Sequence, residues 1–333
     1  MGVPALRQFL GAFLKVLTAF AVGLALAGVL STEPAQAQNQ HSFVSSQGND
    51  ANACTLAAPC RHLQAALAAT ISGGEIAILD TAGYNGGTTV TITKAVSIVN
   101  PGGFEAAIAP PSGGIGIVIN AGTNDAVSLR GLSIDGAGVG ANGIEFINGA
   151  SLTVENCIVR HVSQDGIDFL SNTAPSTLTV SNSLAADNGG SGIYVGPSGA
   201  GAITAVFNRV EANNNGNVGI ELDGSGSAGT NTISGTVSES VAAGNGNAGL
   251  VSSAPVGQAQ TSLMLFHSVV ANNNGNGVLT IGANATIRLA NSAVTGNTAG
   301  WAVLGGFIYS YGDNYIDGNV ASSTGSLTPI SKQ

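Results

Sequence analysis

The chain has 333 residues and a formal net charge of −9, with 49 glycines, 8% charged residues and 5% aromatic residues. Because 44% of the residues are hydrophobic and charge is sparse, the composition excludes an intrinsically disordered chain. The high glycine content also argues against a helical bundle, since glycine weakens helices. The length allows one large domain or two ordinary ones, and the composition favours one unusual domain.

Residues 1–37 have the pattern of a signal peptide. Arg7 and Lys15 flank a positive n-region, residues 16–30 form an apolar h-region, and "AQA" at 35–37 has the small residues that a signal peptidase accepts. The apolar run is shorter than the ~20 residues that span a bilayer, which disfavours an uncleaved membrane anchor. We therefore expect cleavage after Ala37 and a secreted or periplasmic protein that has no membrane contact after removal of the signal.

Residues 38–74 are expected to form an N-terminal extension with a capping helix. Cys54 and Cys60 bracket a short loop, and export to an oxidising compartment favours a disulfide between them over a metal site, for which no further ligand stands nearby. The segment "PCRHLQAALAAT" at 59–70 has a helical pattern, with Pro59 near its start and glycines after its end. A helix here can cover the open end of a stack of strands.

The region 75–306 contains an internal repeat. Each repeat has a glycine followed by a short apolar strand, and successive glycines are 23 to 30 residues apart. The segments are "GIGIVI" at Gly116, "NGIEFI" at Gly143, "DGIDFL" at Gly166, "SGIYVG" at Gly192, "VGIELD" at Gly219, "AGLVSS" at Gly249 and "NGVLTI" at Gly277. Coils of this size cannot bury an apolar face alone, so they are expected to stack into a solenoid.

A second motif runs in phase with the glycines. It consists of strand, asparagine and strand, as in "SLTVENCIV" and "TIRLANSAV", and alternation places one set of apolar residues on the inner face. The asparagines are Asn156, Asn182, Asn208 and Asn291, and two repeats have Glu239 or His267 at this position. We expect these asparagines to adopt a left-handed backbone at a tight corner and to hydrogen-bond to the coils above and below.

These motifs resemble the pectate-lyase-like superfamily over roughly residues 75–320. The resemblance implies an all-β fold, a right-handed parallel β-helix with a short N-terminal capping helix, and an asparagine ladder. Residues 307–333, which are aromatic and rich in turns at 307–319, are expected to form a C-terminal cap and tail, with an aromatic binding patch as the alternative. Cys157 lies in an apolar strand pattern and is expected to be a packed thiol.

The outward residues of the strands after the glycines are candidates for a functional site. They form a column of Glu145, Asp168, Tyr194 and Glu221, in which neighbouring strands lie ~4.8 Å apart. Glu145, Asp168 and Glu221 are the candidate catalytic acids, because two close carboxylates raise one another's proton affinity, so that one can stay protonated as an acid while the other is ionised. Tyr194 offers a ring and a hydroxyl to support a sugar. The acids also have the oxygen ligands that Ca²⁺ prefers, and no other metal or cofactor is expected.

The resemblance implies a groove for a polysaccharide on this face. Pectate lyases use an arginine base beside bound Ca²⁺, and polygalacturonases use aspartates with a histidine and basic residues; neither full motif can be traced onto this sequence. Arg160 and His161 are the basic pair nearest the column in sequence and are the candidate substrate-binding residues. The other reading of the column is that of solvated acids that keep an exposed strand face soluble.

The sequence thus predicts an exported β-helix protein that binds or acts on an extracellular polysaccharide, such as a uronate polymer, as a lyase or a glycoside hydrolase. The alternative is a non-catalytic structural or adhesive surface protein, which the short loops at 170–176 and 195–202 favour. The mature chain has seven Lys and Arg against seventeen Asp and Glu, so nucleic acid is not expected as a partner. We expect a monomer.

Overall fold

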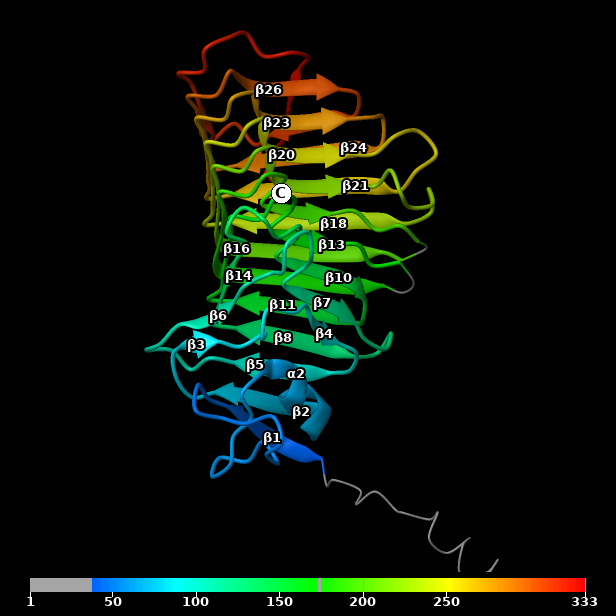
Figure 1. Ribbon diagram of the computed structural model, residues 1–333. Helices are drawn as coiled ribbons and strands as arrows, with labels where there is room; N and C mark the ends of the chain where they lie inside the picture. Colours follow the sequence, from blue (N-terminus) through cyan, green and yellow to red (C-terminus); the bar gives the residue numbers. More distant parts are fainter. Residues whose placement is uncertain (1–37, 173–174, 200, 333) are drawn as a thin grey trace, which may run out of the picture. The chain divides into compact units, whose positions relative to one another are not determined.

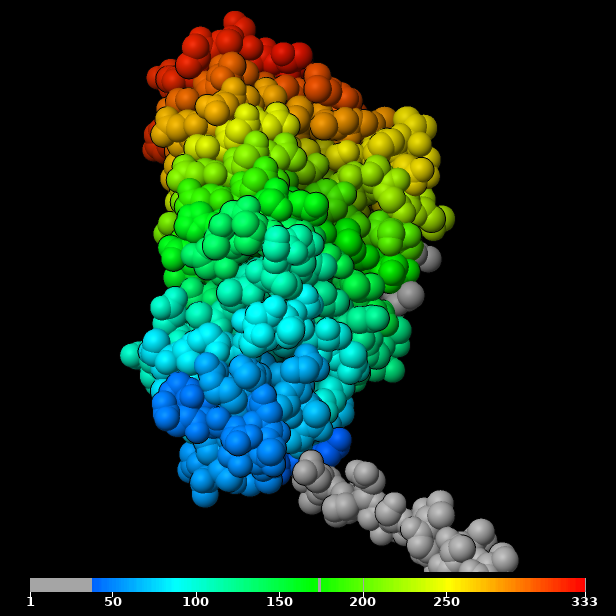
Figure 2. Space-filling model, viewed as in Figure 1, coloured from blue at the N-terminus to red at the C-terminus, as the bar shows by residue number. Residues whose placement is uncertain are grey.

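A computed structural model describes residues 38–172, 175–199 and 201–332. The proposed signal peptide at 1–37 lies outside the described residues, as do parts of the loops at 170–176 and 195–202. The described chain is a parallel β-solenoid in which successive coils form successive layers (Figures 1 and 2). Within these residues, no helix combines the length and the apolar character needed to cross a membrane.

One side of the solenoid is a nine-stranded sheet of parallel strands (Figure 1). Its strands, in order along the stack, are β4 (Val90–Ile92), β7 (Ile117–Asn120), β10 (Ile144–Asn148), β13 (Ile167–Phe169), β15 (Ile193–Val195), β17 (Val218–Asp223), β20 (Ala248–Ser253), β23 (Asn276–Ile281) and β26 (Ala299–Leu304).

The other two sides belong to a twenty-stranded sheet, because β14 and β16 continue around the corner between them. The first side contains β1 (Asn39–Val44), β2 (Thr70–Ile78), β5 (Val96–Val99), β8 (Ala126–Arg130), β11 (Ser151–Glu155), β14 (Ser176–Ala186), β16 (Ile203–Asn213), β18 (Thr232–Ser238), β21 (Gln260–Phe266), β24 (Ala285–Ala290), β27 (Phe307–Ser310) and β29 (Leu327–Pro329). The second side contains β3 (Ala82–Gly83), β6 (Ala106–Ile108), β9 (Leu132–Asp135), β12 (Ile158–Arg160), β19 (Val241–Ala243), β22 (Val269–Ala271), β25 (Ala293–Thr295), β28 (Tyr315–Ile316) and the later halves of β14 and β16.

The core consists of aliphatic stacks, as the alternation predicts. Val154 pairs with Val180 and Leu152 with Leu178 in neighbouring coils, and all four are fully buried. Phe146 and Phe169 extend the stack beneath the nine-stranded sheet, with ring centroids 4.3 Å apart.

The asparagine ladder exists, but not at the positions expected from the sequence. It is formed by Asn188, Asn215, Asn245, Asn273, Asn297 and Asn319, which lie at the corner leading into the nine-stranded sheet. Each side-chain amide donates to the side-chain oxygen of the next asparagine at 2.8–3.0 Å. The same oxygen also accepts the backbone N–H of the asparagine below it, so this buried polar column is satisfied from coil to coil.

The asparagines that were expected to form the ladder lie at another corner, the one between the two sides of the twenty-stranded sheet. Asn156, Asn182 and Asn291 do adopt the left-handed backbone, as do Glu239 and His267, but in one coil the residue is Arg209 and not Asn208. All of these left-handed residues are exposed, so they cannot form a ladder in the interior. The residue that follows each of them points inward instead. In four coils it is a serine, whose hydroxyl oxygen accepts a backbone N–H of the preceding coil at 3.0–3.1 Å; these are Ser183, Ser240, Ser268 and Ser292.

Cys157 occupies the position of a serine in this second ladder. Its backbone N–H donates to Ser183, and its sulfur accepts the N–H of Leu132 at 3.5 Å. Burial raises the pKa of the Cys157 thiol to about 11. The prediction of a packed, unreactive thiol is therefore confirmed.

The asparagine ladder explains why a glycine recurs at this position of the repeat. A Cβ atom added to Gly192 would lie 2.7 Å from the amide nitrogen of Asn215, and one added to Gly219 would lie 2.9 Å from that of Asn245. The glycine thus provides the space in which the ladder amide lies, and any larger residue would displace it.

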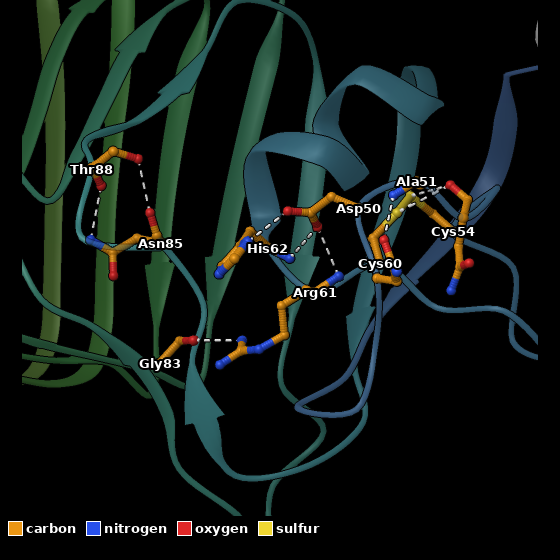
Figure 3. Close-up of polar contacts among 11 residues, drawn as sticks. Asp50, Ala51, Cys54, Cys60, Arg61, His62, Gly83, Asn85 and Thr88 are labelled. Carbon is orange, nitrogen blue, oxygen red and sulfur yellow. Dashed lines mark hydrogen bonds and ion pairs between the residues drawn. A yellow bond between two sulfur atoms is a disulfide. The ribbon is translucent and has the colours of Figure 1, made fainter.

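The N-terminal end is closed by a short helix and a disulfide, as predicted. The helix α2 covers Leu63–Ala69 and is shorter than the segment 59–70 expected from the sequence. The Gln64 side chain accepts the backbone N–H of Thr91 at 3.0 Å, so it covers the free edge of β4. Cys54 and Cys60 form the expected disulfide, beside Asp50, which pairs with the His62 ring at 2.6 Å (Figure 3).

Replacing a ladder asparagine should destabilise the solenoid. Asn245→Ala removes the four side-chain hydrogen bonds of that residue and leaves the buried backbone N–H of Asn215 without its acceptor, so we expect the free energy of unfolding to fall by about 2–4 kcal/mol. Chemical denaturation measures this change. Asn247→Ala is the matched control, since Asn247 is exposed and two residues away; equal losses in the two variants would contradict the role of the ladder.

Candidate functional site

The strands of the nine-stranded sheet bring the four predicted column residues together. Glu145 in β10 pairs with Asp168 in β13, which pairs with Tyr194 in β15, which pairs with Glu221 in β17. Their side chains alternate with buried aliphatic neighbours and therefore point to the outer face. These strands lie in the middle of the stack (Figure 1).

Asp168 is the most enclosed acid of the column, at 7% exposed. Its Oδ2 accepts a hydrogen bond from the amide of Asn142 at 3.1 Å, and the same amide donates to Glu145 at 3.2 Å. Its Oδ1 is buried and has no hydrogen-bond partner. Burial raises the pKa of Asp168 to about 7, and the negative charges of Asp165 and Glu145 add to this effect.

Glu221 has a similar environment two coils further along. It accepts a hydrogen bond from the Ser191 hydroxyl at 3.5 Å. Burial raises its pKa to about 7, with additional contributions from Asp223 and Asp165. Asp168 and Glu221 belong to one outward column with Tyr194 between them, so their strands are two spacings, or ~9.6 Å, apart.

Asp165 is close enough to both of these acids to affect their pKa values. Its Oδ1 accepts the backbone N–H of Ser191 at 2.6 Å, and its charge raises the pKa of both Asp168 and Glu221. Burial also raises the pKa of Asp165 itself. We call the five acids the acid cluster: Glu145, Asp165, Asp168, Glu221 and Asp223.

Tyr194 is held in place by this cluster. Its hydroxyl donates to Asp223 Oδ2 at 3.0 Å, and burial, followed by the charge of Asp223, raises its pKa. A Cβ atom at Gly196 would lie 2.3 Å from the Tyr194 ring, so the ring packs along the backbone of its own chain. The phenol is therefore a fixed, neutral hydrogen-bond donor.

Arg160 and His161 do not join the column. Both contact Asp135, Arg160 through Nε at 2.9 Å and His161 through Nδ1 at 3.1 Å, and Asp135 ends β9 in the twenty-stranded sheet. Arg160 ends β12 and His161 follows it, so both stand before the corner that leads into β13 of the nine-stranded sheet. They therefore lie apart from the column. Among the described residues, no Arg, Lys or His forms an ion pair with the acid cluster.

The ionisable residues of the column occupy four consecutive coils. Beyond Glu221 the same outward column continues as Val251, Leu279 and Ala302, all of which are buried in a small apolar cluster. Solvated acids that only maintain solubility would be exposed, whereas Asp168 is buried with an unsatisfied oxygen. The burial of Asp168 is therefore costly to the fold, as is typical of a functional site.

Four residues of the site were not predicted from the sequence. Three of them, Asn142, Asp165 and Ser191, each stand directly before a repeat glycine, and the backbone register places them in adjacent coils. The aligned segments "NGIEFI", "DGIDFL" and "SGIYVG" contain this second polar column one position before the glycine. The fourth, Asp223, follows Glu221 by two positions in the same strand, so alternation places it on the outer face as well.

The acids of the cluster are not grouped around one point as Ca²⁺ ligands in the described residues. Ca²⁺ takes six to eight oxygen ligands, whereas Glu145 and Asp168 share one amide donor and the remaining acids bond to other groups. Across the part of the chain that the structure describes, no group of three or more His, Cys, Asp or Glu side chains is arranged to hold a metal ion. Ca²⁺ binding remains a prediction, and no step proposed below uses the ion.

The fold and the site define a parallel β-solenoid that carries buried acids on one sheet. The family described as "Right handed beta helix region" matches residues 113–294, which is more than half of the chain. The protein therefore belongs to the right-handed β-helix family. No curated protein matches the sequence.

Two solved structures share this fold. The pectate lyase Pel9A is 18% identical, with a TM-score of 0.54, and the match covers 88% of this chain and 78% of the lyase. The ORF18 protein of Geobacillus virus E2 is 14% identical, with a TM-score of 0.53, and the match covers 93% of this chain and 63% of the viral protein. At these identities the comparison establishes the fold.

Removing the buried charge of Asp168 should change how stability depends on pH. A carboxyl whose folded pKa is raised to about 7 stabilises the fold below its unfolded pKa of ~3.9 and loses that contribution as the pH rises towards 7. Asp168→Asn should therefore match the wild type near pH 4 and exceed its free energy of unfolding near pH 8, by at most about 4 kcal/mol. Denaturation at both pH values tests this, and an equal difference at the two would contradict the raised pKa.

Proposed function

We propose that the protein binds and hydrolyses a polysaccharide on the outer face of the nine-stranded sheet. The observation that carries the proposal is the buried, unpartnered Oδ1 of Asp168. When Asp168 is protonated, Oδ2 still accepts the Asn142 amide, so the proton lies on Oδ1, which has no acceptor among the described residues. Because Oδ1 is covered by neighbouring side chains, a ligand that accepts this proton has to displace them or rotate the carboxyl group. A glycosidic oxygen is such an acceptor.

The reaction needs one acid and one base, and the cluster provides both near neutral pH. Protonated Asp168 gives its proton to the glycosidic oxygen as the bond to the anomeric carbon breaks. Ionised Glu221 takes a proton from the water whose oxygen attacks that carbon, so one water is consumed for each bond cleaved. The ~9.6 Å between their strands is near the upper end of the ~6.5–9.5 Å that separates the carboxyl groups of inverting glycosidases.

The charge of the site favours an uncharged stretch of polysaccharide. The acid cluster has no paired cation in the described residues, so a uronate there would be repelled unless a bound cation neutralised it. We therefore favour hydrolysis over the lyase reaction. The likeness in fold to a pectate lyase supports a polysaccharide as the substrate class, and the Cys54–Cys60 disulfide supports export.

Neutralising either acid should abolish hydrolysis while the fold is retained. We expect Asp168→Asn and Glu221→Gln each to lower kcat at least about 100-fold, since general acid and base catalysis contributes that much. Reducing-end release from a panel of neutral polysaccharides measures the activity. Glu211→Gln is the control, because Glu211 is an exposed acid in β16, outside the nine-stranded sheet.

Activity that persists in Asp168→Asn would exclude the proposed acid. Absence of product and of binding in the wild type with every glycan tested would support the alternative of a non-catalytic structural or adhesive protein.

Calorimetry with Ca²⁺ and a polyuronate tests the alternative that the acid cluster binds a uronate polymer through Ca²⁺. The charge of the acid cluster leads us to expect no uronate binding at this face without Ca²⁺. If Ca²⁺ produces binding that is lost in both Asp168→Asn and Glu145→Gln, the site acts on a uronate through a bridging cation, and the preference for an uncharged glycan is wrong.

A further inference from the structure

A cavity of about 920 Å³ lies on the outer face of the twenty-stranded sheet near its C-terminal end. It is lined by side chains of β21 and β24, by the corner residues that follow these strands, and by the C-terminal segment. None of its lining residues belongs to the nine-stranded sheet or to the acid cluster. It is therefore separate from the proposed hydrolytic site.

The hollow arises from a change in side-chain size within one outward column. Phe266 in β21 pairs with Ala290 in β24, so a large ring is followed by a methyl group in the next coil. Tyr311 and Ile330 line the cavity from the segment beyond. The small side chain of Ala290 therefore leaves a depression between the larger side chains of Phe266, Tyr311 and Ile330.

Arg288 supplies an oriented positive charge at this cavity. Its Nη1 donates to the Ser262 hydroxyl at 2.9 Å, and its guanidinium lies 5.5 Å from the centre of the Tyr309 ring. In the described chain it forms no ion pair, whereas Arg130, Arg160 and Arg209 each face an acid. Two contacts hold the guanidinium in place, and no carboxylate neutralises it.

The charge around the cavity is opposite to that of the protein. Lys332 pairs with Asp313 at 2.8 Å, and both line the cavity with Arg288. Among the described residues that line the cavity, two cations and one acid leave a charge of +1, in a chain whose net charge is −9. An anion is therefore attracted here and repelled by most of the remaining surface.

An aromatic pair borders the same cavity. The rings of Phe266 and His267 stack with centroids 3.8 Å apart, and Phe266 is 39% exposed. The His267 ring also contacts the side chain of Asn291, which fixes its orientation. A rigid aromatic surface of this kind suits the apolar face of a sugar ring.

We propose that this cavity binds a uronate residue of an acidic polysaccharide. The carboxylate pairs with the Arg288 guanidinium, which can donate two parallel hydrogen bonds to it, and the sugar ring lies over Ala290 against Phe266. The proposal combines one unpaired cation, one aromatic surface and a hollow of suitable volume. It extends the sequence-based alternative of an aromatic binding patch at 307–319, since Tyr309 and Tyr311 both contribute.

Equilibrium binding of an oligogalacturonate tests the proposal, with a neutral galacto-oligosaccharide of equal length as the comparison. We expect Arg288→Gln to weaken binding of the acidic oligosaccharide at least about tenfold and to leave unchanged the binding of the neutral one, which the proposed hydrolytic site also accepts. Ala290→Leu, which fills the hollow and keeps every charge, should weaken binding of the acidic oligosaccharide to a similar extent.

Arg209→Gln is the matched control, because it removes an exposed arginine charge elsewhere on the same sheet. It should leave binding of the acidic oligosaccharide unchanged. The assay contains no Ca²⁺, so the acid cluster, which repels a uronate, does not contribute to this binding. The proposal is overturned if the wild type does not bind the acidic oligosaccharide at millimolar concentration, if Arg288→Gln weakens binding of both oligosaccharides equally or of neither, or if Arg209→Gln weakens binding as much as Arg288→Gln does.

Discussion

The structure depends on a two-residue corner that recurs along the central coils. A residue in the left-handed conformation turns the chain, and the next residue points inward, in most coils with a polar side chain that bonds to a neighbouring coil. At one corner that side chain is asparagine; at the other it is serine in four coils, with Cys157 and Val210 in two others. Because each bond joins adjacent coils, the corners fix the register of all three sides at once.

That register is what assembles the acid cluster from distant parts of the sequence. Glu145 and Glu221 are 76 residues apart in the chain, yet they share one outward column because each follows its repeat glycine by two positions. The ladder asparagines beneath the glycines hold this spacing, since Gly192 and Gly219 have no room for a side chain. The scaffold thus tolerates buried carboxylates that would destabilise a less constrained fold.

The fold was predictable because its signals are periodic, whereas the placement of the ladder was not. Alternation correctly placed Val180 inward and Asp168 outward. It failed for Asn208 because Asn favours both a left-handed corner and a buried ladder, and the sequence alone does not say which of two adjacent residues turns inward. The same ambiguity applies to the asparagine-rich turns at 213–217 and 272–276, which contain the ladder residues Asn215 and Asn273 but resemble ordinary loops in sequence.

The candidate site was predictable only in part, for a related reason. Periodicity identifies which residues share a column, so it found Glu145, Asp168 and Glu221 together. It does not show how far a column is buried, so the unsatisfied oxygen of Asp168 and the raised pKa values emerged only from the packing. Sequence proximity also misled for Arg160, which is eight residues from Asp168 but lies on a different sheet, paired with Asp135.

A solenoid separates the residues that specify its fold from those that specify its chemistry. Inward positions and corners determine the coils, and they account for the likeness in fold to a pectate lyase at only 18% identity. Outward positions are free to vary, because a change there alters neither the aliphatic stacks nor the ladders. The acids on one sheet and Arg288 on the other are both outward residues, so membership in the β-helix family predicts the scaffold and leaves the reaction to be argued from these side chains.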